Sequence, residues 1–413
     1  MGGYSKRMRT PLYAGASRID ITPDLNKVRI QLGGYAARLN MPPTGVHDPT
    51  YARVLALRSG TDEGVLVALD HLLVPASLTQ AVLRETGLRP EQLFMSASHT
   101  HCAPDSMGLN ARAHFALPGV GSFVPEFLKF TTERIVSAIR QARAAMQPAR
   151  LAVHVEAVPN LNRNRRGRQI TDPTMTVVRV ENSKRHPIAV LVVYAAHPTI
   201  YPHTMMQVSA EFPGVLQTRL EQTLGGETVA LYMNGAQGDI SPVADEGKDD
   251  HARVRRYGEK LADHATRLLR KATPVEPKLR WRQVQATLPH TRPHPEFYES
   301  AGREYKVPES LLKKLAKQLV PPTSPVSLVG LGPLALVGFP GEPITALGLE
   351  AHERGRQHGF RYVMPVALVN DWIGYILTRE EYERGGYEAT LSFNGPELGA
   401  VVIDAVRRAF LQT

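Results

Sequence analysis

The sequence contains a single cysteine, Cys102, among its 413 residues. One thiol cannot form a disulfide within the chain, and it excludes a zinc site built from several cysteines. A lone cysteine is also typical of proteins from a reducing compartment. Long apolar runs are missing too, because the stretch 188–196 is far shorter than the roughly 18 residues that a membrane-spanning helix needs. We therefore expect neither a disulfide scaffold nor a transmembrane protein.

The remaining composition is typical of a soluble globular protein, with 43% hydrophobic and 21% charged residues. The basic first 13 residues are not followed by the apolar segment of a secretory signal, so we expect a cytoplasmic protein. Low-complexity segments and internal repeats are absent. We expect one domain over residues 1–413, and the sequence leaves the oligomeric state open.

The chain carries a net charge of +10, which attracts phosphate-bearing surfaces over long distances. Two groups of basic residues contribute most visibly: Arg163, Arg165, Arg166 and Arg168, followed by Arg253, Arg255 and Arg256. No nucleic-acid-binding module accompanies them, so we interpret them as solvated faces and do not expect nucleic acid as a partner. Peripheral contact of a basic face with an anionic membrane stays an alternative.

Short apolar runs alternate with helical patterns along the chain. The runs predict strands at 64–69, 93–97, 189–196, 229–233, 334–338 and 363–369. The patterns predict helices at 123–145, 212–223, 253–271, 345–358 and 396–411. This alternation indicates an α/β protein with a mixed, largely buried sheet flanked by helices.

The segment 275–327 differs from its surroundings. It contains a polar strand-like run at 278–288 and a charged helical pattern at 308–319, and three prolines then lead back to the core. We interpret it as an insertion or a lid within the domain.

Polar residues follow several of the predicted strands at the point where each ends. They are His99, His101, His197, Asp239, Ser241, Glu342 and Tyr375. In open α/β sheets, ligands bind at the carboxyl ends of strands. Zinc requires three or four nitrogen, oxygen or sulfur donors, which histidines and a carboxylate supply without cysteine. A single histidine at a strand end is more often structural, but the recurrence favours a metal site at the strand ends.

Five segments carry recognisable motifs in chain order: SHTHCAP at 98–104, AHPT at 196–199, GDISP at 238–242, PGE at 340–342, and YILTREEY at 375–382 with YE at 387–388. They resemble the THTHSGP, IHPT, GDVSP, PGE and HYITTxEEY…YE motifs of the neutral/alkaline (non-lysosomal) ceramidase family. Residues 15–23 and 45–48 also fit that family. The resemblance therefore spans almost the whole chain.

The resemblance implies a Zn²⁺ site and a set of catalytic residues. Its metal ligands would be His99, His197, Glu342 and Tyr375. His101 would lie beside the metal-bound water or the scissile carbonyl, and Ser241 would occupy the catalytic serine position. Arg163 would make a polar contact near the reacting group, and Tyr375 could also stabilise the oxyanion.

The chemistry of these residues is consistent with hydrolysis. Zinc lowers the pKa of bound water to roughly 7 and polarises an amide carbonyl. Ser241 is either a nucleophile or a group that orients water and substrate, and we favour the second role because no Ser-His-Asp order is evident. An extended segment sends residues i and i+2 in similar directions without requiring both to bind. Geometry leaves both possibilities open, and it is the resemblance that implies that His99 binds zinc while His101 faces the substrate.

Other polar residues near the motifs have structural interpretations that we favour over catalysis. Asp239 is expected to cap the turn that follows it, and Tyr382 and Glu388 to fix a loop. Glu211 is expected at a helix N-terminus, where the dipole favours a carboxylate; supporting His197 is its alternative role. Cys102 is expected to be a small packing residue.

The chain departs from the family pattern in places. It stops soon after the YE motif, which predicts the catalytic N-terminal domain without the family's C-terminal β-sandwich. Gly374 replaces a histidine, and residues 105–121 differ from the usual Gly-rich continuation.

We expect a zinc hydrolase that cleaves the amide bond of an N-acyl, ceramide-like substrate by attack of zinc-bound water. One alternative is a zinc hydrolase of small soluble amides, esters or lactones. Another is a non-catalytic, metal-containing protein that binds anionic lipid. Residues suited to binding at all four ligand positions disfavour that last alternative.

Overall fold

The computed structural model describes residues 10–113, 121–305 and 308–412. Most of the basic N-terminal stretch, and residues 114–120 of the segment 105–121 that departs from the family pattern, lie outside the described residues. Within the described part of the chain, no helix is both long and apolar enough to span a bilayer.

The larger of two main sheets has nine strands in the order β11-β9-β8-β6-β1-β3-β4-β5, with β13 paired to β6. Their bounds are β1 Leu12–Asp20, β3 Tyr51–Ser59, β4 Asp62–Leu69, β5 Leu93–Ala97, β6 Gln147–Ala157, β8 Thr174–Asn182, β9 Pro187–Tyr194, β11 Val229–Asn234 and β13 Thr273–Val275. The pairs β9–β11 and β4–β5 are parallel, and the others are antiparallel. The sheet is therefore mixed, as predicted.

A smaller sheet packs against one face of the larger one. Its strands are β14 Leu279–Thr287, β15 Thr323–Leu331, β16 Leu334–Gly338 and β18 Tyr362–Val366. The two sheets share one buried cluster, to which the larger sheet contributes Leu66 and Leu191 and the smaller sheet Trp281 and Leu336. The indole of Trp281 lies directly over Gly64, where an added Cβ would meet it at 2.5 Å. A side chain at residue 64 would therefore push the sheets apart.

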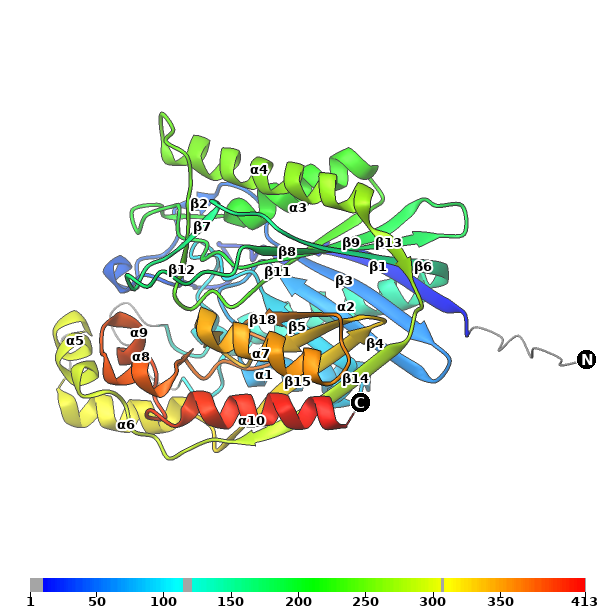
Figure 1. Cartoon of the computed structure of the whole chain (residues 1–413). Coiled ribbons are helices and arrows are strands. Elements are labelled where there is room, and N and C mark those ends of the chain that lie inside the picture. Colours follow the sequence, from blue (N-terminus) through cyan, green and yellow to red (C-terminus); the bar gives the residue numbers. More distant parts are fainter. Residues whose placement is uncertain (1–9, 114–120, 306–307, 413) are drawn as a thin grey trace, which may run out of the picture.

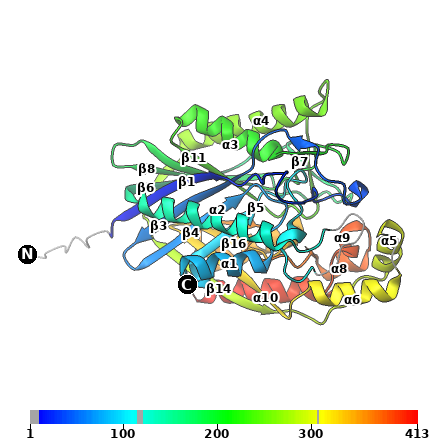
Figure 2. The ribbon, with the colours of Figure 1, turned by 180° about the vertical axis from the view of Figure 1, so that it is seen from behind.

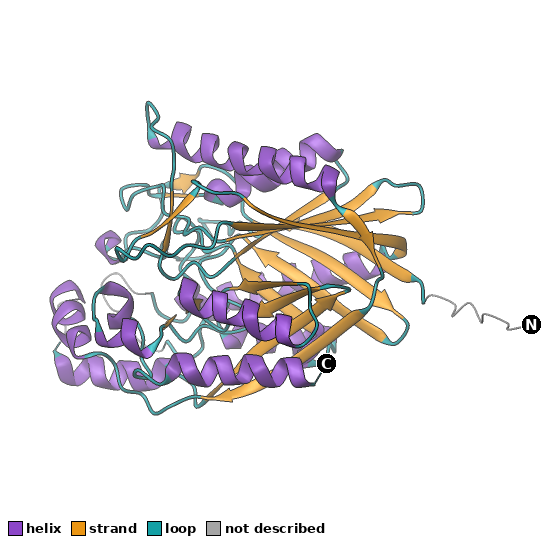
Figure 3. Ribbon diagram, in the orientation of Figure 1, coloured by secondary structure: helices purple, strands orange, loops and turns teal. Residues whose placement is uncertain are grey.

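Helices cover the outer faces of both sheets (Figures 1 and 3). On the larger sheet they are α1 Ala76–Thr86, α2 Pro125–Ala144, α3 Glu211–Leu224 and α4 Asp250–Lys271. On the smaller sheet they are α7 Thr345–Gln357 and α10 Leu398–Leu411. The view from behind shows α1 and α2 crossing the larger sheet (Figure 2). The expected fold, a buried mixed sheet flanked by helices, is confirmed, with a second sheet added.

Alternation within β9 shows why such a strand is buried on both sides. Val190 and Val192 pack toward α3 and α4, whereas Leu191 and Val193 point to the smaller sheet. A strand with two buried faces reads as a continuous apolar run. That is the pattern that the sequence has at this position.

Element boundaries differ from the predictions where local chemistry decides them. Helix α2 begins at Pro125, because proline suits the first helical turn. Helix α4 begins three residues earlier than predicted, because the Asp249 side chain accepts from the Ala252 N–H and caps it. Strand β18 ends at Val366, before Leu368 and Asn370 adopt φ angles of 58° and 62°.

The segment 275–327 contributes to the smaller sheet and to a helical cover. Strands β14 and β15 pair with each other along their full length. Helices α5 Pro295–Tyr305 and α6 Glu309–Leu319 lie between them in the sequence, beside the short helices α8 Arg379–Glu383 and α9 Tyr387–Thr390 (Figure 1). The division of the chain into one domain with an insertion stays a prediction.

Asn234, the last residue of β11, joins the ends of three strands. Its amide donates to the carbonyl oxygens of Ser98 at 3.1 Å and Ala196 at 2.8 Å, which follow β5 and β9. Its backbone oxygen accepts from the Ala367 N–H after β18 at 2.9 Å. The polar segments that follow these strands therefore meet at one place.

Candidate metal centre

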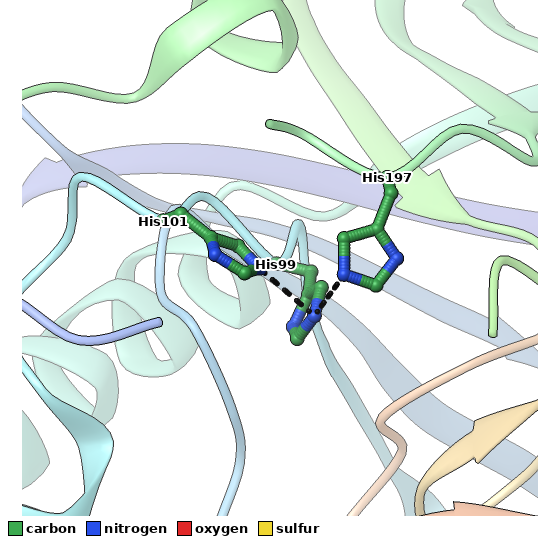
Figure 4. A group of neighbouring side chains, drawn as sticks. All are labelled: His99, His101 and His197. Atoms are coloured by element: carbon green, nitrogen blue, oxygen red, sulfur yellow. Dashed lines mark hydrogen bonds between the residues drawn. The ribbon is translucent and has the colours of Figure 1, made fainter. Parts of the chain in front are cut away.

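Three buried histidines from two loops converge at this place (Figure 4). His99 and His101 follow β5, and His197 follows β9. The Nε2 atom of His99 lies 3.0 Å from Nε2 of His197 and 3.4 Å from Nε2 of His101. One ligand atom from each histidine lies within 4.8 Å of the others. The cluster could therefore hold a metal ion.

Backbone carbonyls orient two of the three rings. His99 Nδ1 lies 2.7 Å from the Leu72 carbonyl oxygen, and His197 Nδ1 lies 3.2 Å from that of Gln237. A carbonyl only accepts, so each Nδ1 must carry the proton and each Nε2 has a free lone pair. This is the arrangement by which proteins fix a metal-binding histidine.

The backbone that carries His99 is turned rather than extended, which corrects one step of the sequence reasoning. His99 has a φ of 72°, in the left-handed region that non-glycine residues rarely adopt. Its N–H donates to the His71 carbonyl oxygen at 2.9 Å. His99 and His101 thus converge because the chain turns sharply. Strained backbone of this kind is frequent at functional sites.

Glu342 brings a carboxylate to the histidines. Its Oε2 lies 3.2 Å from His99 Nε2 and 4.0 Å from His197 Nε2. Its Oε1 accepts from the Trp372 indole N–H at 3.2 Å. Burial raises the pKa of Glu342, but His99 and the hydrogen bonds from Trp372 and Tyr375 outweigh burial and lower it overall. The carboxylate is therefore ionised at neutral pH.

Tyr375 lies beside Glu342 in the paired strands β17 Glu342–Pro343 and β19 Tyr375–Ile376. Its phenol oxygen accepts from Arg165 Nη2 at 2.9 Å. Burial raises the pKa of Tyr375 well above its usual value, followed in size by the effect of Glu342. Without a bound cation, the phenol therefore keeps its proton.

Burial also keeps two of the imidazoles uncharged. It lowers the pKa values of His101 and His197 well below the usual value, and the nearby Arg165 guanidinium lowers them further. Metal ligands must be deprotonated before they bind. Neutral imidazoles are ready for that role at physiological pH.

The spacing of several of these donors is compatible with one metal ion. Ligand atoms at about 2.0–2.1 Å from zinc in tetrahedral geometry lie roughly 3.3 Å from one another. Among the expected ligands, His99 Nε2 lies 3.0 Å from His197 Nε2 and 3.2 Å from Glu342 Oε2, close to that value, whereas His197 Nε2 lies 4.0 Å from Glu342 Oε2. His101 Nε2, at 3.4 Å from His99 Nε2, is also at ligand spacing. A set of nitrogen and oxygen donors without sulfur is suited to zinc and to other divalent transition metals.

A cavity of about 540 Å³ opens from the metal centre. His99, His101, His197, Glu342, Tyr375 and Arg165 form its polar wall. Apolar side chains line much of the rest, including Leu72, Met107, Phe297, Leu312, Ala316, Leu319, Trp372 and Phe393. Helices α5 and α6 supply four of these, so the segment 275–327 forms part of the cavity wall.

Ser241 follows Ile240, whose carbonyl oxygen accepts from the His197 N–H at 3.2 Å, and it pairs with Arg163. They face each other in the short antiparallel pair β12 Ile240–Pro242 and β7 Asn162–Asn164. Ser241 is half-buried and Arg163 is exposed, and neither is among the described residues that line the cavity. Their catalytic roles stay predictions.

Arg165, two residues after Arg163, is the arginine beside the centre. Besides Tyr375, it donates to the Gly238 carbonyl oxygen at 2.8 Å and from Nε to Glu388 Oε1 at 2.8 Å. Asn164-Arg165 repeats the dipeptide Asn162-Arg163, so the short match on which the prediction of Arg163 rests fits Arg165 equally well.

The arginines of residues 165–168 do not form the solvated face that we expected. Arg166 donates to Glu381 and Glu388 at 2.7 Å and 2.5 Å, and its side chain is 6% exposed. Arg168 also pairs with Glu381. Acids of α8 and α9 neutralise this cluster, which the sequence could not show because the partners lie more than 200 residues away. Glu388 fixes a loop, as predicted.

Asp239 is structural, but it caps a more distant element than predicted. Its Oδ1 accepts from the backbone N–H and the hydroxyl of Thr345, at 2.8 Å and 2.7 Å, at the start of α7. Its Oδ2 accepts from the Asn164 amide at 2.7 Å. Cys102 is buried, and burial raises the pKa of its thiol to about 12, consistent with a packing role.

Arg38 and Trp372 are two contributors that the sequence analysis missed. Arg38 is buried and donates to the carbonyl oxygens of His101, Gly33 and Met205, the last two at 2.7 Å and 2.8 Å. Trp372 holds Glu342. Trp372 could have been recognised because it lies three residues before Tyr375 in the sequence. No motif near Arg38 in the sequence indicated that it contacts the site.

Comparison with known proteins identifies relatives of this fold and sequence. Residues 13–256 match the family model of the neutral/alkaline non-lysosomal ceramidase N-terminal domain. Neutral ceramidase B of Dictyostelium discoideum is 24% identical over 257 residues, which are 55% of this chain but 35% of that protein. Neutral ceramidase of Pseudomonas aeruginosa is 22% identical, covering 94% of this chain and 70% of that protein.

Solved structures show the same fold. The crystal structure of the Pseudomonas aeruginosa neutral ceramidase superimposes with a TM-score of 0.84 at 20% identity, covering 97% of this chain and 74% of that one. A ceramidase complexed with C2 gives a TM-score of 0.82 at 19% identity, covering 97% and 75%. The chain thus spans about a third of the Dictyostelium relative and about three quarters of the solved structures.

Proposed function

The chain belongs to the neutral/alkaline non-lysosomal ceramidase family, and on that premise we propose that it is a zinc-dependent amidohydrolase of ceramide-like N-acyl lipids. One observation carries the proposal. Nitrogen and oxygen donors at metal-ligand separations form one wall of a cavity whose other walls are largely apolar. Cavities that combine a few polar groups with apolar walls suit ligands that have a polar reactive group and a hydrophobic chain.

The proposed ligands are His99, His197, Glu342 and Tyr375. These residues would hold a zinc ion, which would supply a lowered pKa of roughly 7 for bound water and polarisation of a carbonyl group. The residues themselves fix its position, because the orientation of His99, His197 and Glu342 is set by Leu72, Gln237 and Trp372.

His101 is proposed to move the proton of the reaction. Its Nε2 faces the other histidines, and its lowered pKa leaves the ring uncharged. His101 would take a proton from the attacking water, and the lowered pKa would favour passing that proton on to the leaving amine. Tyr375 and Arg165 lie where they can stabilise negative charge on the former carbonyl oxygen.

Ser241 is proposed to orient water or substrate. Serine nucleophiles need a base within hydrogen-bonding distance. In the part of the chain that the structure describes, neither His101 nor His197 forms a hydrogen bond with the Ser241 hydroxyl. Intact-mass spectrometry during turnover should therefore detect no acyl-enzyme, and an adduct that Ser241→Ala removes would overturn this role.

The substrate class follows from the apolar wall. Leu312, Ala316 and Phe297 offer the surroundings that an acyl chain prefers to water. The alternative, small soluble amides, esters or lactones, would leave much of this surface unused.

A substrate screen tests the proposal. Purified protein is assayed with fluorescent short-chain ceramide, N-acyl amino acids and simple esters, each with and without a chelator. We expect ceramide hydrolysis that the chelator abolishes and added zinc restores. Chelator-insensitive hydrolysis, or turnover of the soluble compounds alone, would contradict the proposal.

A further inference from the structure

Both histidine loops are joined to a third segment, residues 209–211, at the start of α3. We propose that Ser209 and Glu211 form a clasp that sets the distance between the two loops, and that Glu211 is a positioning residue of the metal centre. The inference rests on the proposed function, because it assumes that the histidines bind a metal ion.

Ser209 holds the loop that carries His99 and His101. Its N–H donates to the Cys102 carbonyl oxygen at 2.9 Å. Its carbonyl oxygen accepts from the Thr100 hydroxyl, also at 2.9 Å. The Thr100 oxygen in turn accepts from the Cys102 N–H at 3.2 Å. Ser209 therefore binds this loop on both sides of His101.

Glu211 holds the loop that carries His197. Its Oε1 accepts from the Ile200 N–H at 2.8 Å, three residues after His197. Its Oε2 accepts from the N–H of Phe212, the next residue in the helix, at 3.2 Å. The side chain is buried, with 2% of the residue exposed. The Glu211 side chain therefore reaches from the start of the helix to the second loop.

Asp48 anchors the clasp to the rest of the fold. Its Oδ2 accepts from the Ser209 hydroxyl at 2.5 Å, and its Oδ1 accepts from the Ala210 N–H at 2.8 Å. The Ser209 hydroxyl oxygen also accepts from the Glu211 N–H at 3.0 Å. Each polar side chain of the clasp therefore forms at least one hydrogen bond.

Backbone strain at Glu211 points to a role beyond beginning a helix. Glu211 has a φ of 56°, a left-handed conformation that a non-glycine residue keeps only where its surroundings hold it. A carboxylate favoured by the helix dipole alone needs no such conformation. Here the turn directs the side chain to Ile200. Since His99 and His197 must meet at 3.0 Å, fixing both loops to one segment preserves the ligand geometry.

Zinc affinity measures this role directly. The full-length protein is stripped of metal and titrated with zinc against a fluorescent chelator. Loss of groups that orient metal ligands lowers affinity by roughly 10–100-fold, and we expect a loss in this range for Glu211→Ala. Glu211→Gln keeps an oxygen that can accept from Ile200 and should retain most of the affinity.

Glu221→Ala is the matched control. Glu221 is also buried on α3, where it pairs with Arg53 at 3.1 Å and with Arg18, and it touches neither histidine loop. Its loss should lower stability without lowering zinc affinity. If Glu211→Ala does not fold, the near-isosteric Thr100→Val replaces it, because it removes the Thr100 bond to Ser209 together with the local bond from the Cys102 N–H.

The outcomes separate the clasp from the proposed function. Cobalt(II) in place of zinc should show an altered visible spectrum in Glu211→Ala and the parental spectrum in Glu211→Gln. If the parent binds zinc tightly and neither Glu211→Ala nor Thr100→Val lowers the affinity, the clasp is wrong. If the parent itself binds no zinc, the proposed metal centre fails, and the clasp with it.

Discussion

Glu342 and Tyr375 face each other as the first residues of two short parallel strands, β17 and β19. The pairing is held by the Glu342 N–H, which donates to the Gly374 carbonyl oxygen at 3.0 Å. Gly374 has a φ of 90°, and an added Cβ would lie 2.2 Å from the Leu391 carbonyl oxygen. Glycine at this position, where the family pattern has histidine, is therefore required by the backbone of this chain.

Gly374→Ala should lower stability and zinc affinity together. The left-handed φ alone costs on the order of 1–3 kcal/mol for a residue with a side chain, and the contact with Leu391 adds to that cost. Urea denaturation of the metal-free protein measures the free energy of unfolding. Gly359→Ala is the control, because Gly359 has a φ of 85° but no atom within 4 Å of an added Cβ. Equal losses in the two variants would show that the contact near Tyr375 is unimportant.

His99→Ala and His101→Ala should separate metal binding from proton transfer. His99 is central to the donor set, so its loss should lower zinc affinity by more than the roughly 10–100-fold that loss of an orienting group costs. His101→Ala should keep stoichiometric zinc but lower kcat by about 10²–10⁴-fold, as expected for a general acid–base. Metal analysis of each purified variant, alongside its rate, decides the matter. Zinc lost equally from both would make His101 a ligand.

The sequence predicted the identity of the clustered residues better than their arrangement. The strand ends near His99, His197 and Glu342 could be located from the sequence, because a buried strand is a run of apolar residues that stops at polar ones. The meeting of those ends depends on the path of the sheet and on Asn234, which a linear pattern does not reveal. The presence of Arg165 in the cavity wall likewise depends on the path of the chain beyond β7, which a linear pattern does not reveal.

Glu211 should give the protein a measurable pH dependence of stability. Burial raises the pKa of its carboxyl from 4.5 to about 8. Between these values the folded state holds a proton that the unfolded state has lost, so stability falls as pH rises from 4.5 to 8 and levels off above that range. Glu211→Gln cannot ionise and should lack this contribution. Urea midpoints of the two metal-free proteins should therefore diverge with pH, and parallel curves would show that Glu211 is ionised throughout.

Ala316→Phe should distinguish long acyl chains from short ones. Ala316 lies on α6, is 1% exposed and lines the apolar wall of the cavity, so a ring there fills space that a long chain needs. Discrimination in apolar pockets reaches about 10–200-fold for small differences in size. We expect kcat/KM for a long-chain ceramide to fall about tenfold or more, while that for a two-carbon acyl substrate changes little. Lys314→Phe places the same ring on the exposed side of α6 and should affect neither substrate. If Ala316→Phe slows both substrates equally, the acyl chain does not lie along α6, and the soluble-substrate alternative gains support.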